Sequence, residues 1–168
     1  LFGLFPYPGR MRFALWPARI AQLLRLDKLI LATGLWKLLP GRLGRLLTML
    51  PHLPRRLPPL PALLPAEGPR RARVALFTGC VQDVIFRQTN WATARVLQKN
   101  GCEVVVPSSQ GCCGAIHFHS GSSPQARQLA DQNISAFDLE DVDAILVNVA
   151  GCGSMLKEYG HHWDDDQQ

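Results

Sequence analysis

Short apolar runs alternate with amphipathic stretches from residue 74 onward. The runs lie near residues 74–78, 103–106 and 144–149, and they are rich in valine, leucine and isoleucine. Continuous apolar runs of four to eight residues are typical of strands that are buried on both faces of a sheet. Pro107 directly follows the second run and ends it, because proline has no N–H to donate. The pattern therefore predicts three buried strands.

The segments between these runs have the period of helices. Residues 84–99 carry Trp91, Ala94 and Leu97 along one side, and a second helix is expected to begin near Ser123-Pro124. A short third helix is expected from Ser154 to Gly160. Strand and helix thus alternate three times, which predicts an α/β fold: a small three-layer, Rossmann-like parallel sheet with right-handed crossovers.

The first 73 residues have a different pattern. Residues 18–39 show a broad apolar face with Arg19, Arg25 and Lys28 around it, which predicts one basic amphipathic helix. Such a helix docks on a protein partner or lies on a membrane surface, and we rank the protein partner first. No run of 18 uncharged apolar residues occurs, so we expect no transmembrane span. Because eight prolines lie from Pro40 to Pro69, residues 40–73 are predicted to be an extended, semi-rigid spacer without a helix.

Charge divides the chain at the same place. Residues 1–73 hold 13 Lys/Arg and 2 Asp/Glu, whereas residues 74–168 hold 5 and 11. We therefore expect a basic, helical and Pro-rich connector over 1–73 and a cysteine-rich α/β domain over 74–168. The basic part suits anionic lipid, nucleic acid or an acidic protein subunit, and a solvated linker is the simpler alternative. Leu1 and the polar end suggest a fragment that is incomplete at its C-terminus.

Four of the five cysteines follow the predicted strands. Cys80 comes after the first strand, Cys112 and Cys113 after the second, and Cys152 after the third and just before a helix. Loops at the carboxyl ends of parallel strands meet at one edge, which is where open sheets bind ligands. Topology alone therefore predicts that these four sulfurs lie together. Cys102 begins the second strand at the opposite edge and is expected to be an ordinary buried cysteine.

The spacing of these cysteines narrows the chemistry. Glycines flank each of them, and glycine lets the backbone approach a bulky group closely. Soft thiolates select iron–sulfur clusters, zinc or copper(I). Structural zinc sites usually use C-x-x-C pairs, whereas Cys112 and Cys113 are adjacent and suit two different irons or a redox-active thiol pair. We rank an iron–sulfur centre above zinc, and both above a structural disulfide.

The residues also resemble a known family. Gly79-Cys80, Gly111-Cys112-Cys113-Gly114 and Gly151-Cys152-Gly153 resemble the cysteine-rich "CCG" domain, which is found in heterodisulfide reductase and in iron–sulfur subunits of flavin-linked 2-hydroxyacid dehydrogenases. The amino-acid sequence over 74–160 is most similar to that of the iron–sulfur subunit of glycolate oxidase (glycolate dehydrogenase). Residues 1–73 resemble the connector of that subunit.

The resemblance implies an electron-transfer subunit of an oxidoreductase. Cys80, Cys112, Cys113 and Cys152 would bind a 4Fe–4S cluster, and no residue of this fragment would be catalytic. FAD would be held by a partner dehydrogenase subunit that oxidises glycolate, and a quinone or similar acceptor would receive the electrons. A set of metal-ligating thiols suits a reduced, cytoplasmic setting. The basic helix and the Leu/Arg-rich connector permit peripheral contact with the inner membrane, and no nucleic-acid partner is expected.

One position departs from the family. Met155 stands where the fuller pattern C-x-x-C has a second cysteine, and a thioether is a weak ligand. The domain therefore holds a cluster with four protein thiolates, borrows a ligand, or is a cluster-free or zinc-holding scaffold for subunit assembly. A thiol–disulfide site at Cys112-Cys113 is a third, weaker function. His117 and His119 follow the cysteine pair in its loop and are further candidate metal ligands or proton donors.

Overall fold

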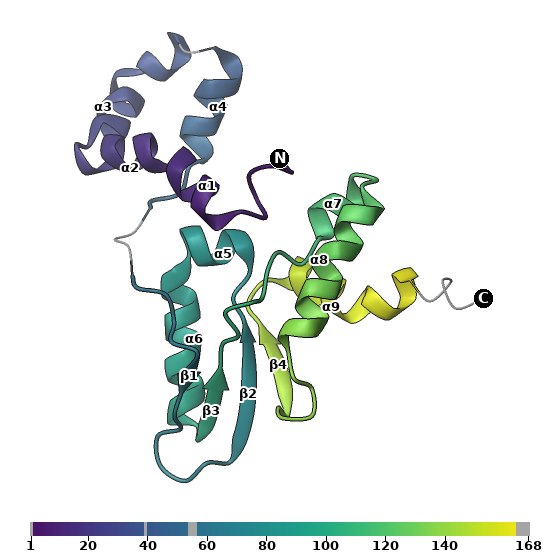
Figure 1. Ribbon diagram of the computed structural model, residues 1–168. Coiled ribbons are helices and arrows are strands. Elements are labelled where there is room, and N and C mark those ends of the chain that lie inside the picture. Colours follow the sequence, from purple (N-terminus) through teal and green to yellow (C-terminus); the bar gives the residue numbers. More distant parts are fainter. Residues whose placement is uncertain (1, 39, 54–56, 164–168) are drawn as a thin grey trace. The chain divides into compact units, whose positions relative to one another are not determined.

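In the computed structural model, the described residues are 2–38, 40–53 and 57–163. They form helices and strands in the order α1 (Pro8–Ala14), α2 (Trp16–Leu23), α3 (Leu26–Thr33), η1 (Leu35–Leu38), α4 (Gly41–Met49), β1 (Leu63–Leu64), β2 (Ala72–Phe77), α5 (Cys80–Ile85), α6 (Arg87–Lys99), β3 (Cys102–Val105), α7 (Ala115–His119), α8 (Ser123–Ala136), β4 (Ala144–Val147) and α9 (Ala150–Trp163) (Figure 1).

The chain divides into two compact units. One contains Gly9–Arg55, and the other contains Leu1–Pro8 together with Arg56–Gln168. The sheet and all five cysteines belong to the second unit. The domain boundary between residues 73 and 74 that the sequence suggests stays a prediction.

The helical unit corrects two expectations. The single helix predicted over 18–39 is wrong, because the backbone turns at Arg25, where φ is 58°, and at Gly34, where φ is 74°. Both residues are in the left-handed region, which cannot continue a right-handed helix. The prediction that no helix occurs in 40–73 is also wrong. Pro40 precedes α4, and no proline lies between residues 41 and 50, so every N–H there is free to bond.

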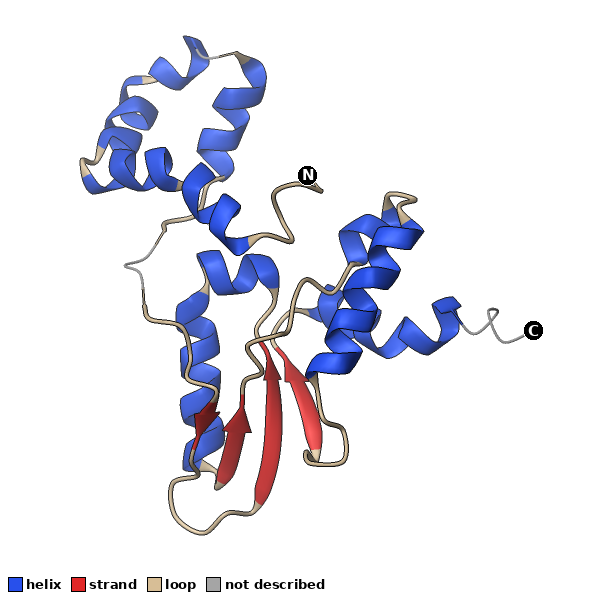
Figure 2. Ribbon diagram, viewed as in Figure 1, coloured by secondary structure: helices blue, strands red, loops and turns tan. Residues whose placement is uncertain are grey.

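The sheet confirms the predicted α/β class. Its strand order is β1-β3-β2-β4, with β2 parallel to both β3 and β4. The short edge strand β1 pairs antiparallel with β3, and the sequence did not predict it. Figure 2 shows the three parallel strands running toward the same edge, where the loops that carry the cysteines begin. The strands end up to two residues earlier than predicted.

Two apolar clusters cover the two faces of the sheet. Leu76 and Val104 pack with Ala94 of α6, whereas Ala75 and Phe77 pack with Ala130 of α8. Successive residues of a strand point to opposite faces, so β2 is buried on both sides. The crossover helices α6 and α8 thus lie on opposite faces. The chain continues from β2 to β3 on one side and later returns to β4 on the other side of β2. The sheet therefore has a topological switch point between β2 and β4, and open α/β sheets form their ligand crevice at such a point.

The helices that flank the cysteines also differ from expectation. The stretch 84–99 is not one helix, because Phe86, with φ −120°, separates α5 from α6. The helix predicted from Ser154 to Gly160 is longer and begins at Ala150, so Cys152 lies inside its first turn. His117 and His119 are not in a loop but in the short helix α7. The helix near Ser123-Pro124 is confirmed as α8, with proline in its first turn.

Candidate functional site

The four glycine-flanked cysteines lie together at the carboxyl edge of the sheet. Cys80 is the first residue of α5, directly after β2, and Cys152 is in the first turn of α9, after β4. Cys112 and Cys113 lie between β3 and α7. The Cys80 Sγ is 3.4 Å from the Cys112 Sγ, and the Cys113 Sγ is 3.2 Å from the Cys152 Sγ. Loops that are far apart in the chain therefore deliver four sulfurs to one place.

Two Sγ–Sγ contacts join cysteines that are far apart in the chain, and the adjacent Cys112 and Cys113 side chains also interact with each other. In each contact one thiol donates to its neighbour: Cys80 to Cys112, and Cys113 to Cys152. All are free thiols, and Cys80, Cys112 and Cys113 are buried while Cys152 is half-buried. Cys102 is only half-buried, which corrects the expectation of a buried residue, and it lies at the start of β3 away from this group.

Hydrogen bonding between the sulfurs decides which of them carries charge. Hydrogen bonds with Cys113 and Cys80 lower the pKa of Cys112 to about 3. The hydrogen bond from Cys113 also lowers the pKa of Cys152. The pKa values of the donors Cys80 and Cys113 are raised, first by these same hydrogen bonds and then by burial. The geometry thus favours the thiolate form at Cys112 and Cys152 over that at Cys80 and Cys113, and thiolate is the form that binds metal.

The four site cysteines are soft donors. Thiolates of this kind bind iron–sulfur clusters, zinc or copper(I). Within residues 2–38, 40–53 and 57–163, no group of three or more His, Cys, Asp or Glu side chains is arranged to hold a metal ion.

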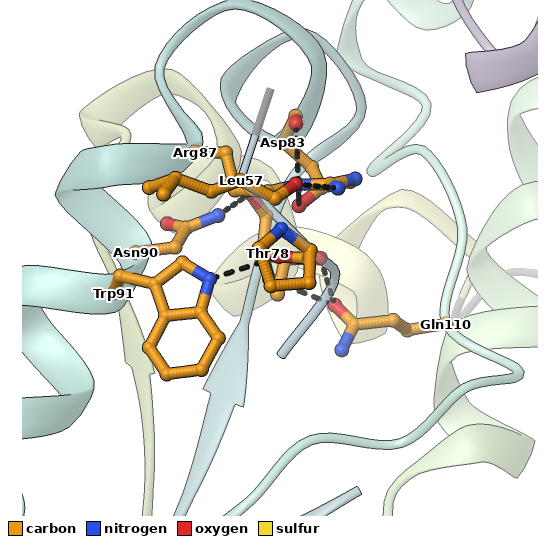
Figure 3. A network of polar contacts seen from close by, with 8 residues as sticks. Leu57, Thr78, Asp83, Arg87, Asn90, Trp91 and Gln110 are labelled. Atoms are coloured by element: carbon orange, nitrogen blue, oxygen red, sulfur yellow. Dashed lines mark hydrogen bonds and ion pairs between the residues drawn. The ribbon is translucent and has the colours of Figure 1, made fainter. Parts of the chain in front are cut away.

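Gln110 ties the Cys112 loop to the end of β2. Its Oε1 accepts from the Thr78 backbone N–H at 2.8 Å and from the Thr78 hydroxyl at 3.2 Å (Figure 3). Its Nε2 donates to the Leu76 carbonyl at 3.1 Å. Thr78 and Gln110 each stand two residues before a site cysteine. This single side chain therefore extends the β2–β3 connection beyond the last strand residues and aligns Cys80 with Cys112.

A second set of amides connects β2, α6 and β4. The fully buried Asn90 donates to the Thr78 carbonyl at 2.9 Å, and Asn148 donates to the Asn90 Oδ1 at 2.8 Å. Thr93 then donates to the Asn148 Oδ1 at 3.0 Å. Asn148 follows the last residue of β4 and precedes Cys152 by four positions. The network fixes the loop after β4 relative to the loop after β2.

Asn133 of α8 holds the turn that carries Cys112 and Cys113. Its Oδ1 accepts from the Gly111 N–H at 2.8 Å, and its Nδ2 donates to the Cys112 carbonyl at 2.9 Å. Tyr159 of α9 donates its hydroxyl to the Cys113 carbonyl at 2.9 Å. Gly114 follows with φ 82°, and a Cβ there would lie 3.1 Å from the Ala126 carbonyl oxygen. Two helices and one glycine therefore shape this turn.

The sequence analysis did not identify Asn133 or Tyr159, although Asn133 left a signal. Ala126, Ala130 and Phe137 form the buried side of α8, and Asn133 occupies the position in that stripe where an apolar residue is expected. A fully buried amide in an apolar stripe needs partners that the helix itself cannot supply. The pattern of α8 indicates that Asn133 makes a polar contact, but it does not identify the loop that Asn133 binds.

The two histidines of α7 lie in different environments. His117 is buried with an exposed fraction of 4%, and it lines a cavity of about 790 Å³ together with Cys80 and Cys112. His119 is exposed. Met155 does not line that cavity and packs in the core with Ala75 and Phe77, so it contributes no sulfur there. Trp91 packs with the α6 cluster and donates to the Pro58 carbonyl at 2.9 Å (Figure 3).

Two family models match parts of this chain. Residues 74–157 match the family described as "Cysteine-rich domain" (CCG). The chain belongs to this family. Residues 1–57 of this chain also match the family described as "Glycolate oxidase iron-sulfur subunit, linker region". No solved structure matches it significantly.

Several curated proteins are similar in sequence to this chain. It is 41% identical over 167 residues to the "Probable glycolate oxidase iron-sulfur subunit" of Bacillus subtilis, a match that covers 98% of this chain and 38% of the relative. It is 36% identical to the "Glycolate oxidase iron-sulfur subunit" of Escherichia coli, over 71% of this chain and 32% of the relative. "Lactate utilization protein A" of an Exiguobacterium species is 34% identical over 55% of this chain and 38% of the relative. The chain thus spans less than two fifths of the length of these proteins.

Proposed function

We propose that this chain is the connector and first cysteine-rich domain of an electron-transfer iron–sulfur subunit in a flavin-linked 2-hydroxyacid oxidase. The observation that carries the proposal is the pair of Sγ–Sγ contacts, Cys80 with Cys112 and Cys113 with Cys152. These four cysteines bind the cluster, which we propose to be of the 4Fe–4S type. The cluster supplies one-electron redox chemistry, and the chain positions it and shields it from solvent.

The relatives support the choice of substrate class. Two of them are named glycolate oxidase iron–sulfur subunits, and another is named for lactate utilization. Glycolate and lactate are both 2-hydroxyacids, and oxidation of either releases two electrons and two protons. A partner subunit with FAD takes this pair of electrons and chooses the substrate. The present subunit passes them on singly to a quinone-type acceptor, which takes up two protons when it is reduced.

Metal analysis of the full-length protein that contains this chain tests the proposal. The protein is purified without oxygen, and iron, acid-labile sulfide and zinc are measured per polypeptide. We expect Cys80→Ser, Cys112→Ser, Cys113→Ser and Cys152→Ser each to lose the same increment of iron and sulfide. Cys102→Ser is the matched control, because Cys102 lies at the other end of β3 and should lose none.

The outcome of the cysteine series separates a cluster from other uses of the thiols. Equal iron content in wild type and all four serine variants would contradict the proposal. Zinc that disappears in the same four variants would instead establish the scaffold function. The buried Met155 is the observation that favours a scaffold, because it removes one thiolate of the family pattern.

The location of the protein stays a prediction. The described residues contain no helix that is long and apolar enough to span a membrane. We propose a cytoplasmic subunit with peripheral contact to the inner membrane. The large apolar side chains that the helical unit exposes, among them Phe13, Leu23, Leu38 and Met49, support that proposal. Co-sedimentation of the full-length protein with liposomes of anionic lipid tests it.

A further inference from the structure

His117 has a buried nitrogen without a hydrogen-bond partner among the described residues. It is the third residue of α7, and its side chain is buried. The unpartnered nitrogen is Nδ1. A buried polar atom without a partner loses its hydration and gains nothing in exchange, so nearly all such atoms in proteins are paired. An unpaired nitrogen in an otherwise well-bonded region therefore indicates a partner that is not part of the polypeptide.

The surroundings of His117 show the chemistry of that partner. Its ring borders the same cavity as Cys80 and Cys112. The one carboxylate that lines this cavity, Asp83, is engaged by Arg87, whose Nε donates to the Asp83 Oδ1 at 2.9 Å (Figure 3). The imidazole and thiol donors that line the described cavity are thus those of His117, Cys80 and Cys112, which are ligand types of a soft metal.

We propose that His117 is a nitrogen donor to the iron–sulfur centre, so that the donor set is four thiolates and one imidazole. This inference rests on the proposed function, since it requires the cluster. Imidazole nitrogen is a regular ligand of iron, and histidine replaces cysteine in some iron–sulfur proteins. The family pattern has a cysteine where this chain has Met155 of α9. His117 of α7 thereby supplies the donor that is missing at that position.

Two features distinguish His117 from His119, which the sequence could not separate. The ring of His117 stacks on Phe2, with centroids 4.6 Å apart and an interplanar angle of 25°, so its orientation is fixed by packing. His119 is exposed and lies two residues further along the helix, about 200° around its axis. A metal ligand binds best when it is held in place beforehand, and the buried, stacked His117 meets that condition better than the exposed His119 does.

Pulsed EPR on the full-length protein with ¹⁵N-labelled histidine tests the assignment. We expect the reduced centre to show a histidine nitrogen coupling that disappears in His117→Gln and persists in His119→Gln. We also expect His117→Cys to keep its iron and to lower the reduction potential, because a thiolate adds negative charge where a neutral imidazole stood. Iron and sulfide content is measured for each variant.

The outcomes distinguish this inference from the function on which it rests. If no histidine coupling is found, or if it persists in His117→Gln while the four cysteine variants lose iron, His117 is not a ligand and the proposed function stands. If the cysteine variants lose no iron, both fail. Loss of iron in His117→Gln with retention in His117→Cys would support ligation over a purely structural role, because cysteine restores a donor but not the shape of the ring.

Discussion

The Asn133 amide nitrogen lies 3.2 Å from the Tyr159 hydroxyl oxygen, and together these two side chains bind both carbonyls of the Cys112-Cys113 pair. Each comes from a different helix, α8 or α9, and both are buried. The turn that carries two of the four site sulfurs is therefore fixed by groups that touch no metal. This arrangement is the basis of the first two predictions.

Replacing Asn133 should destabilise the fold strongly. Asn133→Ala leaves the Gly111 N–H and the Cys112 carbonyl without their partner, and buried groups of this kind cost about 1–3 kcal/mol each. We expect a loss of about 2–4 kcal/mol in the free energy of unfolding, measured by urea denaturation of the chain. The control is the neighbouring Gln132→Ala, which removes one exposed hydrogen bond to the Ser109 carbonyl and should cost under about 1 kcal/mol. Equal losses would show that Asn133 has no special role.

Tyr159 should make stability depend on pH in the alkaline range. Burial raises the pKa of Tyr159, so the folded protein retains the phenolic proton where the unfolded chain loses it. Its contribution is fully present below about pH 10, the ordinary tyrosine value, and is lost as the pH rises toward the raised pKa. We expect Tyr159→Phe to cost about 1–2 kcal/mol at about pH 8. The difference between wild type and variant should shrink above about pH 10, and a difference that is constant to about pH 11 would contradict the assignment.

Gly114 should tolerate a side chain less well than Gly121 does, although the two residues have similar φ values. Gly114 and Gly121 have φ values of 82° and 78°, but a Cβ at Gly114 would lie 3.1 Å from the Ala126 carbonyl oxygen, whereas nothing lies within 4 Å at Gly121. Gly121→Ala should cost about 1–2 kcal/mol, the cost of the left-handed conformation alone. Gly114→Ala should cost more, about 2–4 kcal/mol, because close contact adds to it. Thermal and urea unfolding of both variants measure this order, and the reverse order would show that the close contact is unimportant.

Asn148 should couple the end of β4 to the buried amide of α6. Asn148→Ala leaves the Asn90 Oδ1 without its donor, at a residue that is fully buried, and should cost about 1–3 kcal/mol. Thr93→Val removes the next hydrogen bond of the same network at a less buried site and should cost under about 1 kcal/mol. Hydrogen exchange of the Cys152 loop provides a local readout. Unchanged protection in Asn148→Ala would mean that the network does not hold this loop.

Part of the fold and site followed from local patterns. The apolar runs identified three parallel strands, and the position of each cysteine after a strand predicted that the sulfurs meet. These inferences succeed because side-chain period and strand direction are properties of neighbouring residues. Other features could not be predicted because they depend on contacts with residues that are distant in the chain. The edge strand Leu63–Leu64 exists only through pairing with β3, and a Pro-rich stretch gives no sign of it.

The amino-acid order was enough to establish the α/β class, the edge of the sheet that carries the thiols and the residue types that bind a soft metal. Folding in three dimensions was needed to show which distant sulfurs touch, Cys80 with Cys112 and Cys113 with Cys152, and which histidine is buried beside them. The physical reason is that a side chain's partners are set by elements far away in the chain. Adjacent residues such as Cys112 and Cys113 are directed to different neighbours once β2, α8 and α9 close around their loop.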